Sequence, residues 1–201
     1  MNRVTAIGVY LGDGLKHSRN GVPVATGKVA YRSVSRFARL PLVAFGKLAE
    51  RLASLEHRPV MVGGYLQEYV YEGGRRMQVT VQEVFPVDLL TFKAPLGHPV
   101  VDGYARAEVS GLVARPPAAF PGGYVVRVAV RYPQGAVKEG ETFVNLIIQE
   151  VSLPRPLAQG DRVYAEGAIL GRRNDPDVLD ILVGRIYFGE NAHTGLQVEV
   201  A

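Results

Sequence analysis

Basic side chains are concentrated in the first half of this 201-residue chain, and they are its main candidates for binding chemistry. Residues 1–101 contain 13 Lys and Arg against 7 Asp and Glu, a net charge of +6, whereas residues 102–201 carry a net charge of −2. Four cations follow one another closely, at Lys28, Arg32, Arg36 and Arg39. This asymmetry indicates an anionic partner for the first half. The alternative is an ordinary solvated surface of mixed charge.

Residues that support catalysis or metal binding are not grouped in the sequence. The four histidines are scattered without ligand spacing, so we expect neither a metal nor another cofactor. No phosphate-binding loop or nucleophile elbow is present, and Gly12-Asp13-Gly14 fits a turn better than a phosphate cradle. Asp175 and Asp177 also fall in a turn, where solvated charge is the ordinary interpretation. The sequence therefore predicts a protein that is not an enzyme.

The composition disfavours several other classes of protein. Hydrophobic residues make up 47% of the chain and charged residues 21%, which is typical of a globular protein rather than a disordered one. No apolar run approaches the length of about 18 residues that a membrane-spanning helix needs. The first residues lack the apolar segment of a signal peptide. Because cysteine is absent, a reducing, cytoplasmic location is expected.

Most of the chain alternates apolar and other residues with the period of a β-strand. The clearest runs are 4–10, 77–81, 126–130 and 179–183, and turn residues such as Asn20-Gly21 separate them. One helix is predicted from Lys47 to about Glu56, because Leu48, Leu52 and Leu55 recur on one helical face. Its counterpart at 150–157 contains two prolines and should be one turn or absent.

The two halves of the sequence repeat one another. The pairs Gly8 and Gly111, Val60 and Val163, and Gly64 and Gly167 are each 103 residues apart. A period of that length corresponds to a whole small domain. Each half contains about five strands with one short helix after the third, which is the OB-fold pattern. We therefore predict an all-β protein of two tandem OB-fold barrels, at 1–92 and 102–190, with a stiff linker at 93–101 and a C-terminal strand or tail at 191–201.

With these elements in place, the first half resembles the bacterial single-stranded DNA-binding protein (SSB) family along nearly its whole length. The motif at 43–50 (VAFGKLAE) is the most specific point of likeness, supported by the opening strand from Asn2, by Gly64-Tyr65-Leu66 and by the segment 71–76. The second half resembles the family more faintly, through the repeat. Some bacteria carry a two-barrel form of which a dimer supplies four barrels, so the resemblance implies a homodimer that binds single-stranded DNA.

The resemblance also implies particular binding residues. Binding without sequence preference uses aromatic faces for base stacking and cations for phosphates. The family mostly uses Trp, which this chain lacks, and its aromatic positions correspond here to Phe45, Tyr71, Arg39 and Ser35. Tyr65, Tyr69 and Tyr71 alternate along one strand and would share a face. The resulting set for the first barrel is Lys28, Arg32, Arg36, Arg39, Phe45, Lys47, Tyr65, Tyr69, Tyr71, Arg75 and Arg76.

The second half departs further from the family pattern. Counted by the repeat, Phe45 is matched by Ile148, and the acidic residues Asp175, Asp177 and Asp180 would repel phosphate. A partial platform could still form from Arg127, Arg131, Tyr132 and Phe143. The alternative is that the second barrel serves dimerisation or spacing.

The sequence favours sequence-independent binding and protection of single-stranded DNA in replication, recombination or repair. A competing hypothesis is an OB-fold scaffold or accessory protein, primosome-like or in DNA uptake, that acts mainly through protein contacts. The chain ends in LQVEVA without the acidic tail through which SSBs recruit other enzymes. Recruitment of replication proteins is therefore not expected, as in a specialised paralogue or a mobile-element version.

Overall fold

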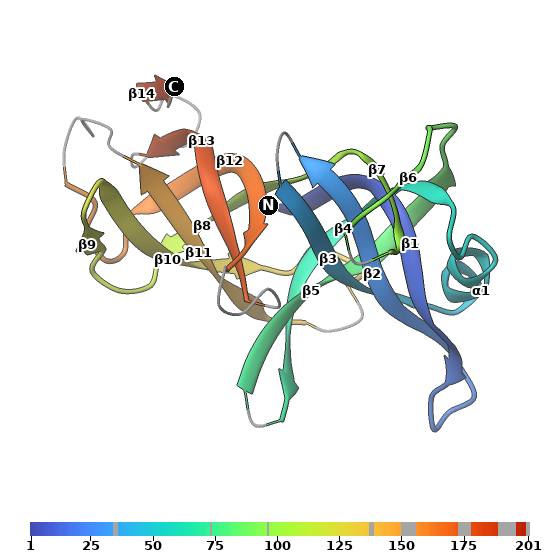
Figure 1. The fold of residues 1–201 in the computed structure, drawn as a ribbon. Coiled ribbons are helices and arrows are strands. Elements are labelled where there is room, and N and C mark those ends of the chain that lie inside the picture. The colour runs from blue at the N-terminus through green and yellow to red at the C-terminus, as the bar shows by residue number, and fades with distance from the viewer. Residues whose placement is uncertain are drawn as a thin grey trace.

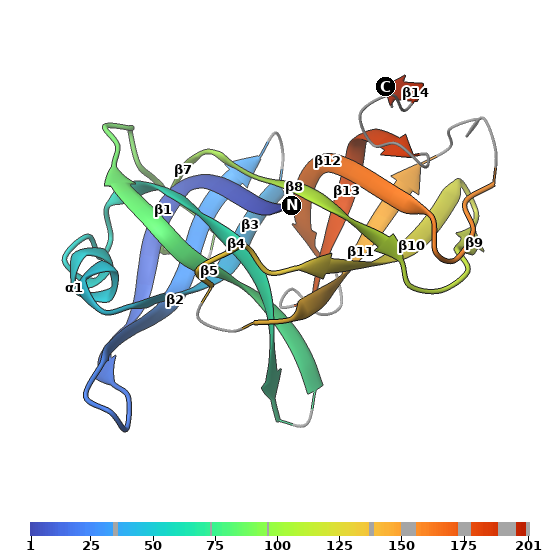
Figure 2. The ribbon, with the colours of Figure 1, turned by 180° about the vertical axis from the view of Figure 1, so that it is seen from behind.

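The structure is a computed structural model that describes residues 1–33, 36–72, 74–95, 97–136, 139–149, 156–172, 178–188 and 196–199. For Tyr71, Phe188 and residues 196–199 it describes the backbone alone. Two β-barrels lie side by side, with the N-terminus at their junction (Figures 1 and 2).

The first barrel is formed by β1 (Asn2–His17), β2 (Pro23–Ser33), β3 (Arg36–Phe45), β4 (Pro59–Tyr71) and β5 (Gly74–Pro86). The strands close in the order β1-β2-β3-β5-β4-β1. All neighbours are antiparallel except β3 and β5, which pair in parallel through Leu42 with Val79 and Val43 with Thr80. The alternating apolar residues that predicted the strands form the barrel core, among them Leu40, Leu42 and Leu66.

The second barrel repeats this topology with β8 (Tyr104–Val113), β10 (Gly123–Arg131), β11 (Glu141–Gln149), β12 (Arg162–Gly171) and β13 (Leu179–Phe188). A short β9 (Ala118–Phe120) lies beside β10, and β14 (Leu196–Glu199) lies beside β13. The prediction of two tandem OB-fold barrels is confirmed.

The paired glycines of the repeat mark the places where neighbouring strands approach most closely. A Cβ at Gly8 would collide with the carbonyl oxygen of Ala30, and one at Gly111 with that of Ala129. Gly64 and Gly167 likewise face the carbonyl oxygens of Thr80 and Leu182, each at a β-bulge. The glycines are therefore repeated because both barrels need them for closure.

The predicted helix is present as α1 (Lys47–Ala53), which lies at the outer end of the first barrel (Figure 1). It buries Ala49 and Leu52 and is shorter than predicted, because the chain turns at Ser54 and Leu55 enters the core from the turn. Of its predicted counterpart at 150–157, residues 150–155 lie outside the described residues and residues 156–157 are not helical. Within the part of the chain that the structure describes, α1 is the one helix.

The segment predicted as a linker is structured and packs on the first barrel. It contains β6 (Phe92–Lys93) and β7 (Pro99–Asp102), which pair with each other. β7 also pairs in parallel with β2, through Tyr31 with Val101 and Arg32 with Asp102. We call Phe92–Asp102 the interbarrel hairpin.

Direct strand pairing joins the two barrels. The first half of β1 pairs antiparallel with β8, from Asn2 with Val109 to Ile7 with Tyr104. The side-chain amide of Asn2 donates to Leu66 O and accepts from Leu66 N, both at 2.9 Å. Between the barrels, the rings of Tyr65 and Tyr132 pack with centroids 5.9 Å apart, and the Tyr31 hydroxyl lies 3.4 Å from Ile169 O. These contacts fix the barrels as one unit.

Candidate nucleic-acid interface

Side chains that point outward from β2, β3, β4 and β5 form the surface on which most of the predicted residues of the first barrel lie. On β2 and β3 the register places Lys28 opposite Pro41, Ala30 opposite Arg39, and Arg32 opposite Phe37. Because side chains alternate along a strand, all of these point away from the core. We call this surface the basic face; its members are Lys28, Arg32, Phe37, Arg39, Phe45, Tyr69 and Arg76.

Arg32 is held by the interbarrel hairpin. Its guanidinium donates to both carboxylate oxygens of Asp102, at 2.6 and 2.9 Å, and stacks over the Phe92 ring at 4.2 Å from the centroid. The hydrogen bonds from Arg32 lower the pKa of the Asp102 carboxyl. The charge of Arg32 is thus largely compensated within the protein.

Phe37 is an exposed aromatic side chain that the sequence analysis did not include. It lies on β3 directly opposite Arg32, two residues from Arg39, and 46% of its surface is exposed. An exposed phenyl ring between cations is what base stacking requires. Phe37 lies two residues before Arg39, so strand alternation alone places both side chains on the same side of β3 and could have identified it. The aromatic positions of the SSB family, however, correspond to other residues of this chain.

Tyr65 does not belong to the binding set, because its side chain is 1% exposed and packs against Tyr132 of the second barrel. The alternation that placed Tyr65 and Tyr69 on one face is correct, but the junction between the barrels covers that face at Tyr65. Tyr132, also predicted as part of a platform, has the same packing role. The buried Tyr65 ring is not available for stacking, whereas the Tyr132 ring is half-buried and lines the groove between the barrels.

Two predicted arginines lie on the other side of their strands. Arg36 pairs with Ser33, so alternation directs it away from the face that carries Arg39. Arg75 pairs with Val70 on the side of the hairpin opposite Arg76, and it forms an ion pair with Glu68 at 3.1 Å. Arg36 and Arg75 therefore do not lie on the basic face.

The remaining predicted residues of the first barrel differ in how they lie. Phe45 is half-buried at the end of β3, opposite Val24. Lys47 is exposed at the start of α1, beside the basic face rather than on it. The side chain of Tyr71 and the whole of Ser35 lie outside the described residues.

The second barrel carries a corresponding outward surface. β11 and β13 pair in parallel, through Leu146 with Ile181 and Ile147 with Leu182, as β3 and β5 do in the first barrel. When the two parallel pairs are aligned, Arg127, Arg131 and Phe143 take the places of Lys28, Arg32 and Arg39. The Arg127 guanidinium lies over the Phe143 ring at 5.1 Å. By this register Phe45 corresponds to Gln149, because Ile148 points into the core and is fully buried.

Asp180 is less repulsive toward phosphate than the sequence suggested. Its carboxylate accepts hydrogen bonds from Arg172 at 2.7 and 3.0 Å and from the Asn145 amide at 3.0 Å. Its charge is therefore compensated in place. Asp175 and Asp177 lie outside the described residues.

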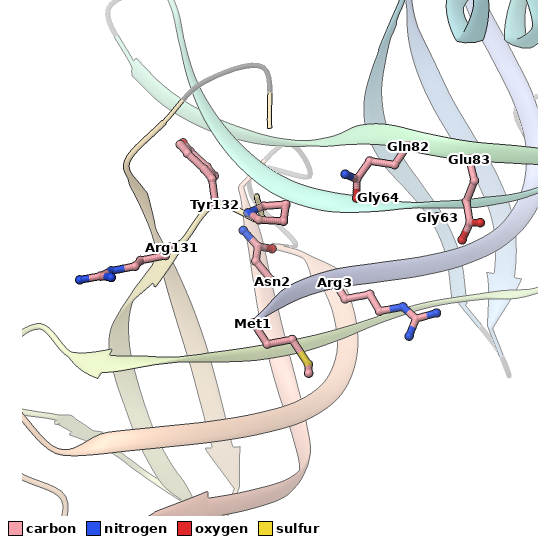
Figure 3. Close-up of a pocket in the computed structure, with 10 residues that line it drawn as sticks. Met1, Asn2, Arg3, Gly63, Gly64, Gln82, Glu83, Arg131 and Tyr132 are labelled. Atoms are coloured by element: carbon pink, nitrogen blue, oxygen red, sulfur yellow. The ribbon is translucent and has the colours of Figure 1, made fainter. Parts of the chain in front are cut away.

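A groove of about 460 Å³ lies at the junction of the barrels (Figure 3). The first barrel contributes Arg3, the Gly63-Gly64 bulge and Glu83, and the second contributes Arg131 and Tyr132. The N-terminal amine, whose pKa burial lowers, forms a hydrogen bond with the Ser110 hydroxyl beside it. The lining of the groove carries Arg3, Arg131 and the N-terminal amine against the single carboxylate of Glu83.

Within the described ranges, no three His, Asp or Glu side chains are grouped so that they could hold a metal ion. Among the same residues, no helix is long and apolar enough to cross a membrane.

Comparison with solved structures identifies the fold. The single-stranded DNA-binding protein from Thermus aquaticus superimposes with a TM-score of 0.70 over 95% of this chain and 94% of that one, at 15% sequence identity. The chain has the two-barrel OB fold of that protein. A deletion variant of the same Thermus protein gives a TM-score of 0.68 at 16% identity over 95% of each chain. In sequence, no protein-family model matches the chain and no curated protein does.

Proposed function

We propose that the protein binds single-stranded DNA without sequence preference and protects unpaired strands during replication, recombination or repair in the cytoplasm. The observation that carries the proposal is the basic face, where exposed Phe37 lies between the cations of β2 and β3. The two-barrel fold shared with a single-stranded DNA-binding protein supports it. Binding would combine stacking on Phe37, Phe45 and Tyr69 with phosphate contacts from Lys28, Arg39 and Arg76.

A competition assay tests this proposal. A labelled oligo-dT is bound to the protein at low salt, and unlabelled oligo-dT or a duplex of equal length is added. Binding through stacked bases requires unpaired bases, so we expect the single strand to displace the probe at much lower concentration than the duplex. Equal competition by duplex, or a Kd in the micromolar range or weaker at low salt, would contradict the proposal.

We further propose that the protein is a homodimer, so that two chains supply four barrels. A second sheet face, away from the basic face, crosses β5, β4, β1 and β8, and the register aligns Phe85, Met61, Ile7 and Tyr104 in one row across it. Phe85 is 41% exposed and Tyr104 39% exposed, so the row is apolar and partly open. Contiguous exposed apolar patches are typical of protein interfaces.

The oligomeric state is measured by analytical ultracentrifugation of the wild type and of Tyr104→Glu. A carboxylate buried in this apolar row would be unpaired, so the variant should sediment as a monomer while the wild type sediments as a dimer. Leu112→Glu, which changes an exposed apolar residue of β8 outside the row, is the matched control. A monomeric wild type would refute the homodimer.

A further inference from the structure

The interbarrel hairpin covers part of the basic face. Ala94 and Val100 are buried against Ala30, the β2 residue that lies opposite Arg39. A turn closes the hairpin, with Gly97 N donating to Ala94 O at 2.8 Å and Ala94 N donating to His98 O at 2.9 Å. The hairpin therefore forms a raised edge along β2, next to the cations of β3.

The hairpin is held in this position at both of its strands. Phe92 of β6 stacks on the Arg32 guanidinium, and Asp102 of β7 accepts two hydrogen bonds from the same group. β7 also continues the sheet beside β2. One arginine therefore contacts both strands of the hairpin and holds them beside β2.

His98 extends from this turn to Arg39. The Arg39 Nη2 atom lies 3.2 Å from Nδ1 and 3.5 Å from Nε2 of the imidazole. The charged groups on the elements around the ring are Lys28 and Arg32 on β2, Arg39 on β3, Lys93 on β6 and Asp102 on β7. Of these groups, Arg39 contacts the ring, and Asp102 is paired with Arg32.

We propose that the interbarrel hairpin forms one wall of the single-strand site and that His98 and Arg39 together bind a backbone phosphate, with the imidazole taking up a proton from solvent as the strand binds. This inference rests on the proposed function and adds a residue and a pH dependence to the same site. It also gives the segment between the barrels a direct part in binding.

The direction of the pH dependence follows from the charges. In the free protein, burial and then the Arg39 cation lower the pKa of His98, which favours the neutral imidazole. A phosphate beside both groups offsets the Arg39 charge and favours the imidazolium, which raises the pKa in the complex. Affinity therefore increases as the pH falls, by up to about tenfold for each pKa unit between the two states.

The test is the Kd for an oligo-dT at pH 7.5, 6.5 and 5.5 at constant ionic strength. We expect wild-type affinity to increase as the pH falls and His98→Gln to lose most of that increase, with a Kd near that of the wild type at pH 7.5. His98→Arg carries a permanent cation and should bind tightly at pH 7.5 with little pH dependence. Thermal melting of each variant checks folding.

Other groups titrate in the same range, and a matched variant corrects for them. His57→Asn replaces an exposed histidine with φ of 62°, a conformation that Asn accepts, and should keep the wild-type pH profile. Calorimetry in two buffers of different ionisation enthalpy should show proton uptake that His98→Gln reduces. Equal pH profiles for the wild type and His98→Gln would overturn the inference and leave the proposed function intact. A wild type that binds no oligo-dT at any pH would overturn both.

Discussion

Phe37→Ala is the substitution that most directly separates base stacking from charge at the basic face. Phe37 lies on the outward side of β3, outside both buried clusters, with nearly half of its surface exposed. Removing the ring leaves Arg32, Arg39 and Lys28 in place. The variant should therefore lose stacking energy and keep the phosphate contacts.

The expected size of the effect follows from the value of one stacked base. Base stacking on an aromatic side chain contributes about 1–3 kcal/mol, which corresponds to an increase in Kd of about 5- to 150-fold. The slope of log Kd against log salt should stay at the wild-type value, because no cation is lost. The folded state should be little affected, since Phe37 is outside the core.

Fluorescence anisotropy with a labelled oligo-dT at several salt concentrations measures both quantities. Phe120→Ala is the matched control, since Phe120 lies on β9 of the second barrel with a similar 37% exposure. If Phe37→Ala and Phe120→Ala both bind within about twofold of the wild type, the phenyl ring of Phe37 is not a platform. A change in salt slope for Phe37→Ala would show that the ring acts by positioning cations instead.

Four further predictions concern charge, closure and titration. Arg39→Ala should weaken oligo-dT binding and reduce the salt slope by about 0.7, whereas Arg36→Ala, on the other side of β3, should change neither by a measurable amount. Asp102→Asn releases the Arg32 charge from an exposed ion pair, so affinity should increase by up to about fivefold at low salt. Gly64→Ala and Gly167→Ala force a Cβ into a carbonyl oxygen, so each should lower the free energy of unfolding in urea by about 1–3 kcal/mol or more. Gly184→Ala is the control, because its Cβ would meet nothing closer than 3.8 Å and the variant should keep wild-type stability. Burial raises the pKa values of Tyr10 and Tyr31 to about 12, and at Tyr10 the charges of Asp13 and Glu56 contribute. Because the folded state favours the protonated phenols, the free energy of unfolding should be constant below about pH 10 and decline toward pH 12. Tyrosinate absorbance and urea unfolding at each pH measure the two effects.

The repeat and the strand alternation were sufficient to predict the two barrels. Gly8, Gly64, Gly111 and Gly167 are required by close strand approach, so their spacing directly reports barrel closure. The close spacing of Lys28, Arg32, Arg36 and Arg39 indicated one cationic surface; the register of β2 and β3 brings three of them together and directs Arg36 to the other side. These features depend on local geometry, which a single sequence records well.

Contacts between the barrels could not be predicted from the sequence. Tyr65 has the alternation of a surface residue, and only its packing on Tyr132, in the other half of the chain, buries it. Arg32 and Arg39 have the appearance of open cations until the interbarrel hairpin brings Asp102 and His98 to them. Two prolines and a glycine favoured a linker there, but burial of Ala94 and Val100 on β2 decides the structure.

An oligo-dT length series at two salt concentrations tests the central claim, that the basic face binds single-stranded DNA. Affinity should increase with length until the site is filled. The slope of log Kd against log salt should be about 0.7 for each phosphate contacted, so that binding weakens steeply as salt is added. A Kd that depends on neither length nor salt would contradict it.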